Sequence, residues 1–137
     1  MFEVSVEETF AAGHALRGYR GKCENVHGHN YKIRVTLAGS ELGPIGLLFD
    51  FKDLKDAIQC TVRKLDHQFL NDIAPFDAVN PSAENLAKYF YDEITRLLAE
   101  NGPKGNPSAP CVLKRVTVWE TDTTTASYCA EGRVGSV

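Results

Sequence analysis

The sequence predicts an α+β domain, and the order of three groups of segments indicates it. Two segments of alternating apolar and polar residues open the chain, two segments with helical spacing follow, and two further apolar segments close it. Strands grouped before and after a pair of helices are typical of α+β domains with an antiparallel sheet. A length of 137 residues suits one domain with its own core and is too short for two catalytic domains. We therefore expect residues 1–137 to form a single domain.

The first two predicted strands form a hairpin with a long connection. Apolar side chains alternate with polar ones from residue 2 toward residue 10, with the period of a half-buried strand. A second alternation runs from about residue 26 to residue 37. His14 is expected just past the end of the first strand. The hairpin therefore gathers His14 and the residues before the second strand at one end of the sheet.

The middle of the chain predicts two helices. Apolar residues recur at helical spacing from residue 52 to residue 65, and Asp66 with His67 would end this helix or begin the loop after it. Ser82 is a candidate N-cap for the second helix, with Glu84 favourably placed in its first turn.

The last part of the chain predicts a loop and two strands. Residues 101–110 are rich in glycine and proline and predict a flexible loop. An apolar strand at residues 112–119 would deliver Glu120 at its end, and a final strand near residues 126–131 would complete four strands.

Three of the four histidines suggest a metal site. Alternate side chains of a strand share a face, so His27 and His29 project together, and Gly28 between them leaves room for a ligand. His14 would complete a set of three imidazoles. Three protein ligands and an open position are typical of catalytic zinc, whereas structural zinc sites close all four positions. The alternative is that His27 and His29 are half-exposed strand residues.

Cys23, Asp66 and His67 are the candidate reactive groups. Cys23 lies just ahead of the second and third histidines. His67 directly follows a carboxylate that could orient its ring, although adjacency in sequence does not prove contact. The four cysteines are widely spaced without a Cys-x-x-Cys pair, so we expect free thiols, three of them in packing positions.

Composition and charge exclude several classes of partner. A net charge of -3 and a pI near 5.8 provide no basic field for a nucleic acid. No apolar run reaches membrane-spanning length, and the acidic N-terminus is unlike a signal peptide, so we expect no membrane partner and a cytoplasmic location. A local cluster of Arg17, Arg20 and Lys22 would attract a small anionic substrate, unless it is only a solvated loop.

The order of motifs resembles the 6-pyruvoyl-tetrahydropterin synthase family, and more closely its bacterial 6-carboxy-tetrahydropterin branch in queuosine biosynthesis. The resemblance covers roughly residues 2–131. The three residues between Cys23 and His27 favour the carboxy branch, because the pyruvoyl branch typically places two more residues there. Each motif is weak alone, and their shared order makes the resemblance specific. The motifs are Phe10 to His14, the Cys-x-x-x-His-Gly-His run, Asp50-Phe51, Leu65-Asp66-His67, Leu70-Asn71, Asn80-Pro81 and Glu120.

The resemblance implies a zinc enzyme. The three histidines would bind Zn²⁺, the Cys23 thiol would be catalytic, and Asp66 with His67 would be its proton-transfer partner. Glu120 would anchor the pterin ring of the substrate.

The start of the second predicted helix would also bind the substrate, through Ser82 and Glu84. The family usually has Pro-Thr-Ser-Glu or Pro-Thr-Thr-Glu in this segment, whereas residues 81–84 are Pro-Ser-Ala-Glu. The missing hydroxyl at Ala83 could remove one pterin contact. The loop at 101–110 is also longer than the family pattern.

The resemblance further implies a fold, an assembly and a reaction. The fold would be the T-fold, a ββααββ arrangement with a four-stranded antiparallel sheet and two helices on one face. Sheets of a homo-oligomer, commonly a hexamer built as a dimer of trimers, would form a barrel with active sites between subunits. The substrate would be 7,8-dihydroneopterin triphosphate, converted to 6-carboxytetrahydropterin, acetaldehyde and triphosphate. A 6-pyruvoyl-tetrahydropterin synthase, and a noncatalytic zinc- or pterin-binding protein in which Cys23 closes the metal site, are the alternatives.

Overall fold

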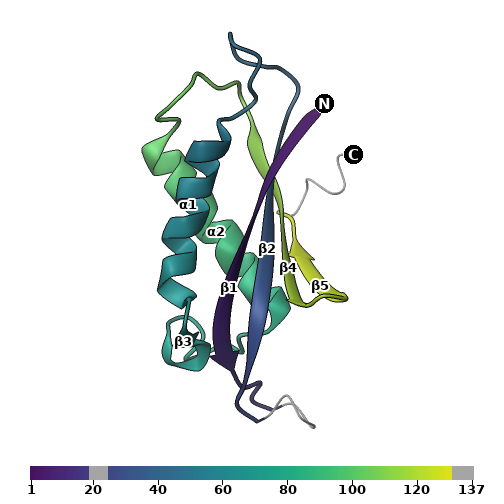
Figure 1. Cartoon of the computed structure of the whole chain (residues 1–137), viewed down its shortest axis with the longest axis vertical. Coiled ribbons are helices and arrows are strands. Elements are labelled where there is room, and N and C mark those ends of the chain that lie inside the picture. Colours follow the sequence, from purple (N-terminus) through teal and green to yellow (C-terminus); the bar gives the residue numbers. More distant parts are fainter. Residues whose placement is uncertain (19–24, 131–137) are drawn as a thin grey trace.

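Two helices cover one face of a sheet, which confirms the predicted α+β class (Figure 1). The computed structural model of the chain describes residues 1–18 and 25–130. Among these residues, no helix is long and apolar enough to cross a membrane. The sheet has the strand order β3-β1-β2-β4-β5. The strands and α-helices of the chain are β1 (Phe2–His14), β2 (His27–Gly39), α1 (Phe51–Leu65), β3 (Gln68–Phe69), α2 (Ala83–Asn101), β4 (Val112–Thr121) and β5 (Thr124–Tyr128).

The hairpin of β1 and β2 carries the three candidate metal ligands to one end of the sheet. The two strands are antiparallel, and the register ends at the pair His14 and His27. Phe10 pairs with Tyr31, and both side chains are buried against the helices. Because residues at every second position share a face, His14, His27 and His29 point to this same side.

Side-chain caps determine where the two helices begin. The Asp50 carboxylate accepts a hydrogen bond from the Lys52 N–H (2.9 Å) at the start of α1. The Ser82 hydroxyl oxygen accepts one from the Asn85 N–H (3.1 Å), so the predicted N-cap of α2 is confirmed. Both caps satisfy N–H groups that have no partner inside the helix.

The hydrophobic core lies between the helices and the inner face of the sheet. Leu54 and Ile58 of α1, and Phe90 and Ile94 of α2, are fully buried there. The apolar stripes that predicted the helices therefore form the core. The opposite face of the sheet is polar. On it, Arg34 forms an ion pair with Glu7 (2.6 Å).

The structure corrects two expected strand boundaries and adds one short strand. His14 is the last residue of β1 and not a residue past its end, because the hairpin pairing extends to His27. The final strand is Thr124–Tyr128 and begins earlier than expected, because a tight turn pairs Thr121 with Thr124. Beside the four expected strands, the two-residue strand β3 pairs in parallel with β1 at Ala12.

Candidate functional site

The three histidines predicted to bind a metal ion lie together at the end of the β1–β2 hairpin. One ring nitrogen from each of His14, His27 and His29 lies within 4.8 Å of the others. The Nε2 atoms of His14 and His27 are 3.0 Å apart. His14 is fully buried, and the other two are partly buried. The strand register produces this cluster because His14 is opposite His27, and His29 is the next residue of β2 on the same face.

The outer nitrogens of two of these rings face backbone carbonyls. Nδ1 of His14 lies 3.1 Å from the Pro81 oxygen, and Nδ1 of His27 lies 2.7 Å from the Asn25 oxygen. A carbonyl only accepts, so in the tautomer that donates to it Nδ1 carries the proton; on His14 the Tyr31 hydroxyl also lies 2.8 Å from Nδ1. The two Nε2 atoms then present lone pairs to each other at short distance, an arrangement that a cation between them would stabilise.

Glu120 and an unpartnered nitrogen complete the inner surface of the cluster. One carboxylate oxygen of Glu120 lies 3.3 Å from Nε2 of His14 and 3.6 Å from Nε2 of His29. Among the described residues, Nε2 of His29 is a buried side-chain nitrogen without a hydrogen-bond partner. Buried polar atoms in native proteins are nearly always satisfied by a partner, water or an ion. Three imidazole nitrogens and a nearby carboxylate therefore fit a Zn²⁺-type ion.

Burial favours the metal-binding form of the His14 and His29 rings. Desolvation lowers the pKa of His14 and of His29 below the ordinary histidine value. The Pro81 carbonyl and Glu120 partly offset this effect on the pKa of His14. Neutral imidazole is the metal-binding form, so the site is prepared for a cation at neutral pH.

Asp66 and His67 form a second cluster on the other edge of β1. The Asp66 carboxylate lies 3.1 Å from Nδ1 of His67 and also accepts a hydrogen bond from the Ala11 N–H (3.0 Å). The bond from Ala11 lowers the pKa of Asp66, and His67 lowers it further. His67 has a φ of 58°, a left-handed conformation that is unfavourable for a residue with a side chain. Its ring is 81% exposed, and the contact with Asp66 that the sequence left open is present.

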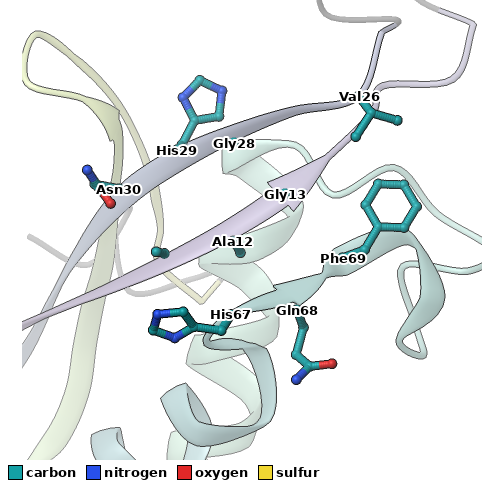
Figure 2. A pocket seen from close by; sticks show the side chains of 10 residues that line it. Ala12, Gly13, Val26, Gly28, His29, Asn30, His67, Gln68 and Phe69 are labelled. Atoms are coloured by element: carbon teal, nitrogen blue, oxygen red, sulfur yellow. The ribbon is translucent and has the colours of Figure 1, made fainter.

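A hollow of about 540 Å³ lies beside the paired ends of β1 and β2. Both His29 and His67 line it, together with residues of β1 and β3 (Figure 2).

The backbone at the entrance of α2, the segment just before the helix, contacts the cluster of three histidines. Pro81, whose carbonyl accepts from His14, directly precedes Ser82. Ser82 is partly buried and caps the helix, while Glu84 is exposed in its first turn. The hydroxyl proton of Ser82 is free for another acceptor, because the cap uses only the oxygen lone pair. The predicted substrate-binding segment therefore lies next to the predicted metal ligands.

Some predicted site residues lie outside the described residues. These are Cys23, the candidate catalytic thiol, and Arg20 and Lys22 of the basic cluster. Arg17, the third member of that cluster, is described and exposed.

The structure adds three residues that pattern reasoning did not assign to the site. The Tyr31 hydroxyl lies 2.8 Å from Nδ1 of His14, and burial raises the pKa of Tyr31. Asn71 and Asn80 hydrogen bond to the backbone just after His14. Tyr31 had the signature of a core strand residue, and the only signal for the asparagines was their place in two of the motifs above.

Comparisons with known proteins agree with this site. Residues 3–131 match the protein-family model described as 6-pyruvoyl tetrahydropterin synthase. The chain is 36% identical to a 6-carboxy-5,6,7,8-tetrahydropterin synthase of Bacillus subtilis, over 93% of this chain and 83% of that one. It is also 36% identical to the human 6-pyruvoyl tetrahydrobiopterin synthase, over 81% of this chain and 72% of that one.

A solved structure extends the similarity to the fold. The Caenorhabditis elegans 6-pyruvoyl tetrahydropterin synthase superposes with a TM-score of 0.75 at 29% identity, over 96% of this chain and 98% of that one. The T-fold expected from the motifs is therefore confirmed. Since the family match spans nearly all of the sequence, the chain belongs to the 6-pyruvoyl tetrahydropterin synthase family.

Proposed function

We propose that the protein is a zinc-dependent 6-carboxy-5,6,7,8-tetrahydropterin synthase that acts on 7,8-dihydroneopterin triphosphate. The products would be 6-carboxytetrahydropterin, acetaldehyde and triphosphate, made in the cytoplasm as a step of queuosine biosynthesis. The observation that carries the proposal is the cluster of three imidazoles with one buried Nε2 atom unpartnered among the described residues. A site of this kind is open for a catalytic metal ion and one substrate oxygen.

His14, His27 and His29 would hold the Zn²⁺ ion. Zinc, when bound, supplies a Lewis acid for an oxygen of the substrate side chain. The hydrogen bonds from Nδ1 of His14 and His27 to backbone carbonyls fix the ring orientations, as outer partners of metal ligands commonly do.

Two groups would move protons at the substrate side chain. The Cys23 thiolate would remove a proton from a carbon next to a hydroxyl. His67 would return a proton, with Asp66 holding its ring through Nδ1. Support for this role comes from the exposure of the His67 ring and from its position on the same hollow as His29.

Carboxylates and the basic residues would orient the substrate. Glu120, or Glu84 at the helix entrance, can accept paired hydrogen bonds from the ring amide N–H and the exocyclic amine of a pterin. The Ser82 hydroxyl is available for a further contact. Arg17, with Arg20 and Lys22, would meet the triphosphate. Glu120 lies within 3.6 Å of two metal-ligand histidines, so we expect it to bind the substrate beside the metal.

The carboxy reaction is preferred to the pyruvoyl reaction for two reasons. The Bacillus subtilis relative with the carboxy name aligns with 93% of the chain, against 81% for the human relative with the pyruvoyl name. The short spacing between Cys23 and His27 also favours the carboxy branch. The pyruvoyl activity is the second candidate because the human relative is equally identical where it aligns.

We also propose that the protein is a homo-oligomer, with a hexamer as a dimer of trimers. From Phe2 to Phe10, the outer edge of β1 has no strand partner among the described residues, and β5 is the other edge of the sheet. Unpaired edges favour pairing with another copy of the chain. Light scattering that gives the mass of one chain at micromolar concentration would overturn this proposal.

The decisive experiment is incubation of zinc-loaded protein with 7,8-dihydroneopterin triphosphate. Products are identified by mass spectrometry, and acetaldehyde is trapped chemically. The matched variant is Cys23→Ala, with Cys60→Ala as a control because Cys60 is a free thiol on α1. We expect 6-carboxytetrahydropterin and acetaldehyde from the wild type and from Cys60→Ala, and neither product from Cys23→Ala with zinc still bound.

Other outcomes separate the alternatives. A 6-pyruvoyl product would assign the sister activity. Absence of turnover, together with loss of zinc from Cys23→Ala, would support a noncatalytic protein in which the thiol closes the metal site.

A further inference from the structure

Only a two-residue strand pairs the outer edge of β1 near its end, and single groups on either side of it satisfy the other peptide groups. At Ala11, the N–H donates to the Asp66 carboxylate (3.0 Å), and the carbonyl accepts from the His67 N–H (2.6 Å). β3 then pairs with only two residues of β1, Ala12 and Gly13. Beyond them the edge continues without a strand.

Asn71 takes the place of a strand at Ala15. The Ala15 N–H donates to Oδ1 of Asn71, and Nδ2 of Asn71 donates to the Ala15 carbonyl, both at 2.9 Å. Both residues are buried, with 3% of Ala15 and 6% of Asn71 exposed. A carboxamide has one acceptor and one donor side by side, so it can satisfy both peptide groups of a residue as a strand would.

Asn80 repeats the same pairing two residues further on. The Arg17 N–H donates to Oδ1 of Asn80 (2.8 Å), and Nδ2 of Asn80 donates to the Arg17 carbonyl (2.7 Å). In an extended chain, residues i and i+2 direct their peptide groups to the same edge. Asn71 and Asn80 therefore continue the edge pairing along residues 15–17.

Asn80 also belongs to the entrance of α2. Its own carbonyl accepts a hydrogen bond from Nδ2 of Asn85 (2.8 Å), and the next residue, Pro81, accepts from His14. Two contacts thus join the end of β1 and the chain after it to the same short segment, one at His14 and one at Arg17. The segment leads directly into Ser82 and Glu84.

We infer that Asn80, supported by Asn71, is a positioning residue of the site. It holds the entrance of α2, with its substrate-binding residues, at a fixed position relative to the metal ligand His14. The identity of the substrate rests on the proposed function, whereas the positioning itself follows from the hydrogen bonds. This role of Asn80 involves no contact with the substrate.

The test compares Asn80→Ala with Asn106→Ala, both loaded with zinc. Asn106 also donates a carboxamide hydrogen bond (2.9 Å), to Asp50, but lies in the loop after α2. Neopterin affinity is measured by calorimetry, KM and kcat by turnover, and zinc affinity by competition with a chelator. Since His14 keeps its strand pairing, we expect Asn80→Ala to bind zinc within about threefold of the wild type, with neopterin affinity and KM weakened about tenfold. Asn106→Ala should change none of these constants.

A second variant and a second measurement keep the inference testable. Asn80→Asp retains the acceptor for the Arg17 N–H and loses the donor, so its neopterin affinity should lie between wild type and Asn80→Ala. Hydrogen exchange of the Arg17 amide and of residues 82–85 should be faster in both variants. Unchanged exchange at residues 82–85, or unchanged neopterin affinity in a folded Asn80 variant, would overturn the inference.

If the wild type binds no neopterin and turns over no substrate, the proposed function fails. The exchange measurement still decides whether Asn80 positions the entrance of α2.

Discussion

At both ends of the sheet, side chains hold irregular segments of the chain in place. The two ends differ in whether their polar atoms have hydrogen-bond partners. The histidine end contains His14, His27, His29 and Glu120. The aspartate end contains Asp50 and Asp53 at the start of α1, and the loop residues 104–106 that they bind. Ring nitrogens at the histidine end face one another, and Nε2 of His29 is buried without a partner among the described residues.

At the aspartate end, both carboxylates accept hydrogen bonds from the loop. Oδ2 of Asp53 accepts from the N–H groups of Lys104 and Gly105, both at 3.0 Å, and Asp53 is 8% exposed. Asp50 accepts from Asn106 as well as capping α1. A Cβ on Gly105 would lie only 2.8 Å from the Asp50 carboxylate, so the loop approaches α1 closely. The segment expected to be a flexible loop is thus held by partly buried hydrogen bonds to Asp53 and an exposed one to Asp50.

The difference separates stability from function. A buried acceptor with its donors in place stabilises the fold and is available for nothing else. A buried nitrogen without a donor destabilises the fold slightly unless a ligand binds it. We therefore expect a bound cation to stabilise the histidine end and not the aspartate end.

Replacement of one histidine of the cluster should have the largest effect on the zinc-induced stabilisation of the protein, which is measured only when zinc is present. Zinc at a thousand times its Kd adds about 4 kcal/mol to the free energy of unfolding of the wild type. His29→Ala should weaken zinc binding by about a hundredfold or more, which reduces this stabilisation to about 1.4 kcal/mol or less. Urea unfolding with and without zinc measures this stabilisation. Asn30→Ala, the exposed neighbour on β2, is the control and should keep the full stabilisation. Equal stabilisation of His29→Ala would contradict the metal assignment.

Loss of an acceptor at the aspartate end should have a smaller effect that zinc does not change. Asp53→Ala leaves the N–H groups of Lys104 and Gly105 without their acceptor, so we expect about 1–3 kcal/mol less stability. Asp56→Ala on the same helix removes only an exposed ion pair with Lys52 and should change stability by less than about 0.5 kcal/mol. Urea unfolding compares the two variants. The comparison of the two ends fails if Asp53→Ala also lowers zinc affinity.

The smallest of the expected effects is the pH dependence of the stability of the metal-free protein, which should differ between the two ends. The pKa values of His14 and His29 lie below the unfolded value of 6.5, so the unfolded state binds protons first. Their contribution to stability is complete above pH 6.5 and is lost as pH falls through the folded values.

The Asp50 pKa is lowered, mainly by the hydrogen bond from the Lys52 N–H. Its contribution is therefore present above pH 3.8 and is lost only in stronger acid. Unfolding midpoints across this range should show a smaller upper step in His14→Gln, where His29 still contributes, and a smaller lower step in Asp50→Asn. An upper step that is unchanged in His14→Gln would show that another group causes it.

Local patterns predicted most of the fold. Alternation identified the β1–β2 hairpin, helical spacing identified α1 and α2, and the Ser82 cap was found because N-caps need a short polar side chain. The two-residue strand β3 has no pattern of its own, since its pairing with Ala12 depends on where α1 ends. The start of β5 was missed because turn residues and strand residues are both threonine there.

The sequence by itself predicted the cluster of three histidines that could hold a metal ion. The spacing of His27 and His29 on one strand, with His14 at the end of its neighbour, leaves one geometry once the hairpin is paired. The order of the motifs also determined the family.

Only the tertiary structure decided how the site is held. The contacts of Glu120 with His14, of Pro81 with His14 and of Asn80 with Arg17 join residues far apart along the chain. Each depends on the packing of the helices against the sheet. A local pattern cannot encode such a contact, because burial of a polar group is settled by everything that surrounds it.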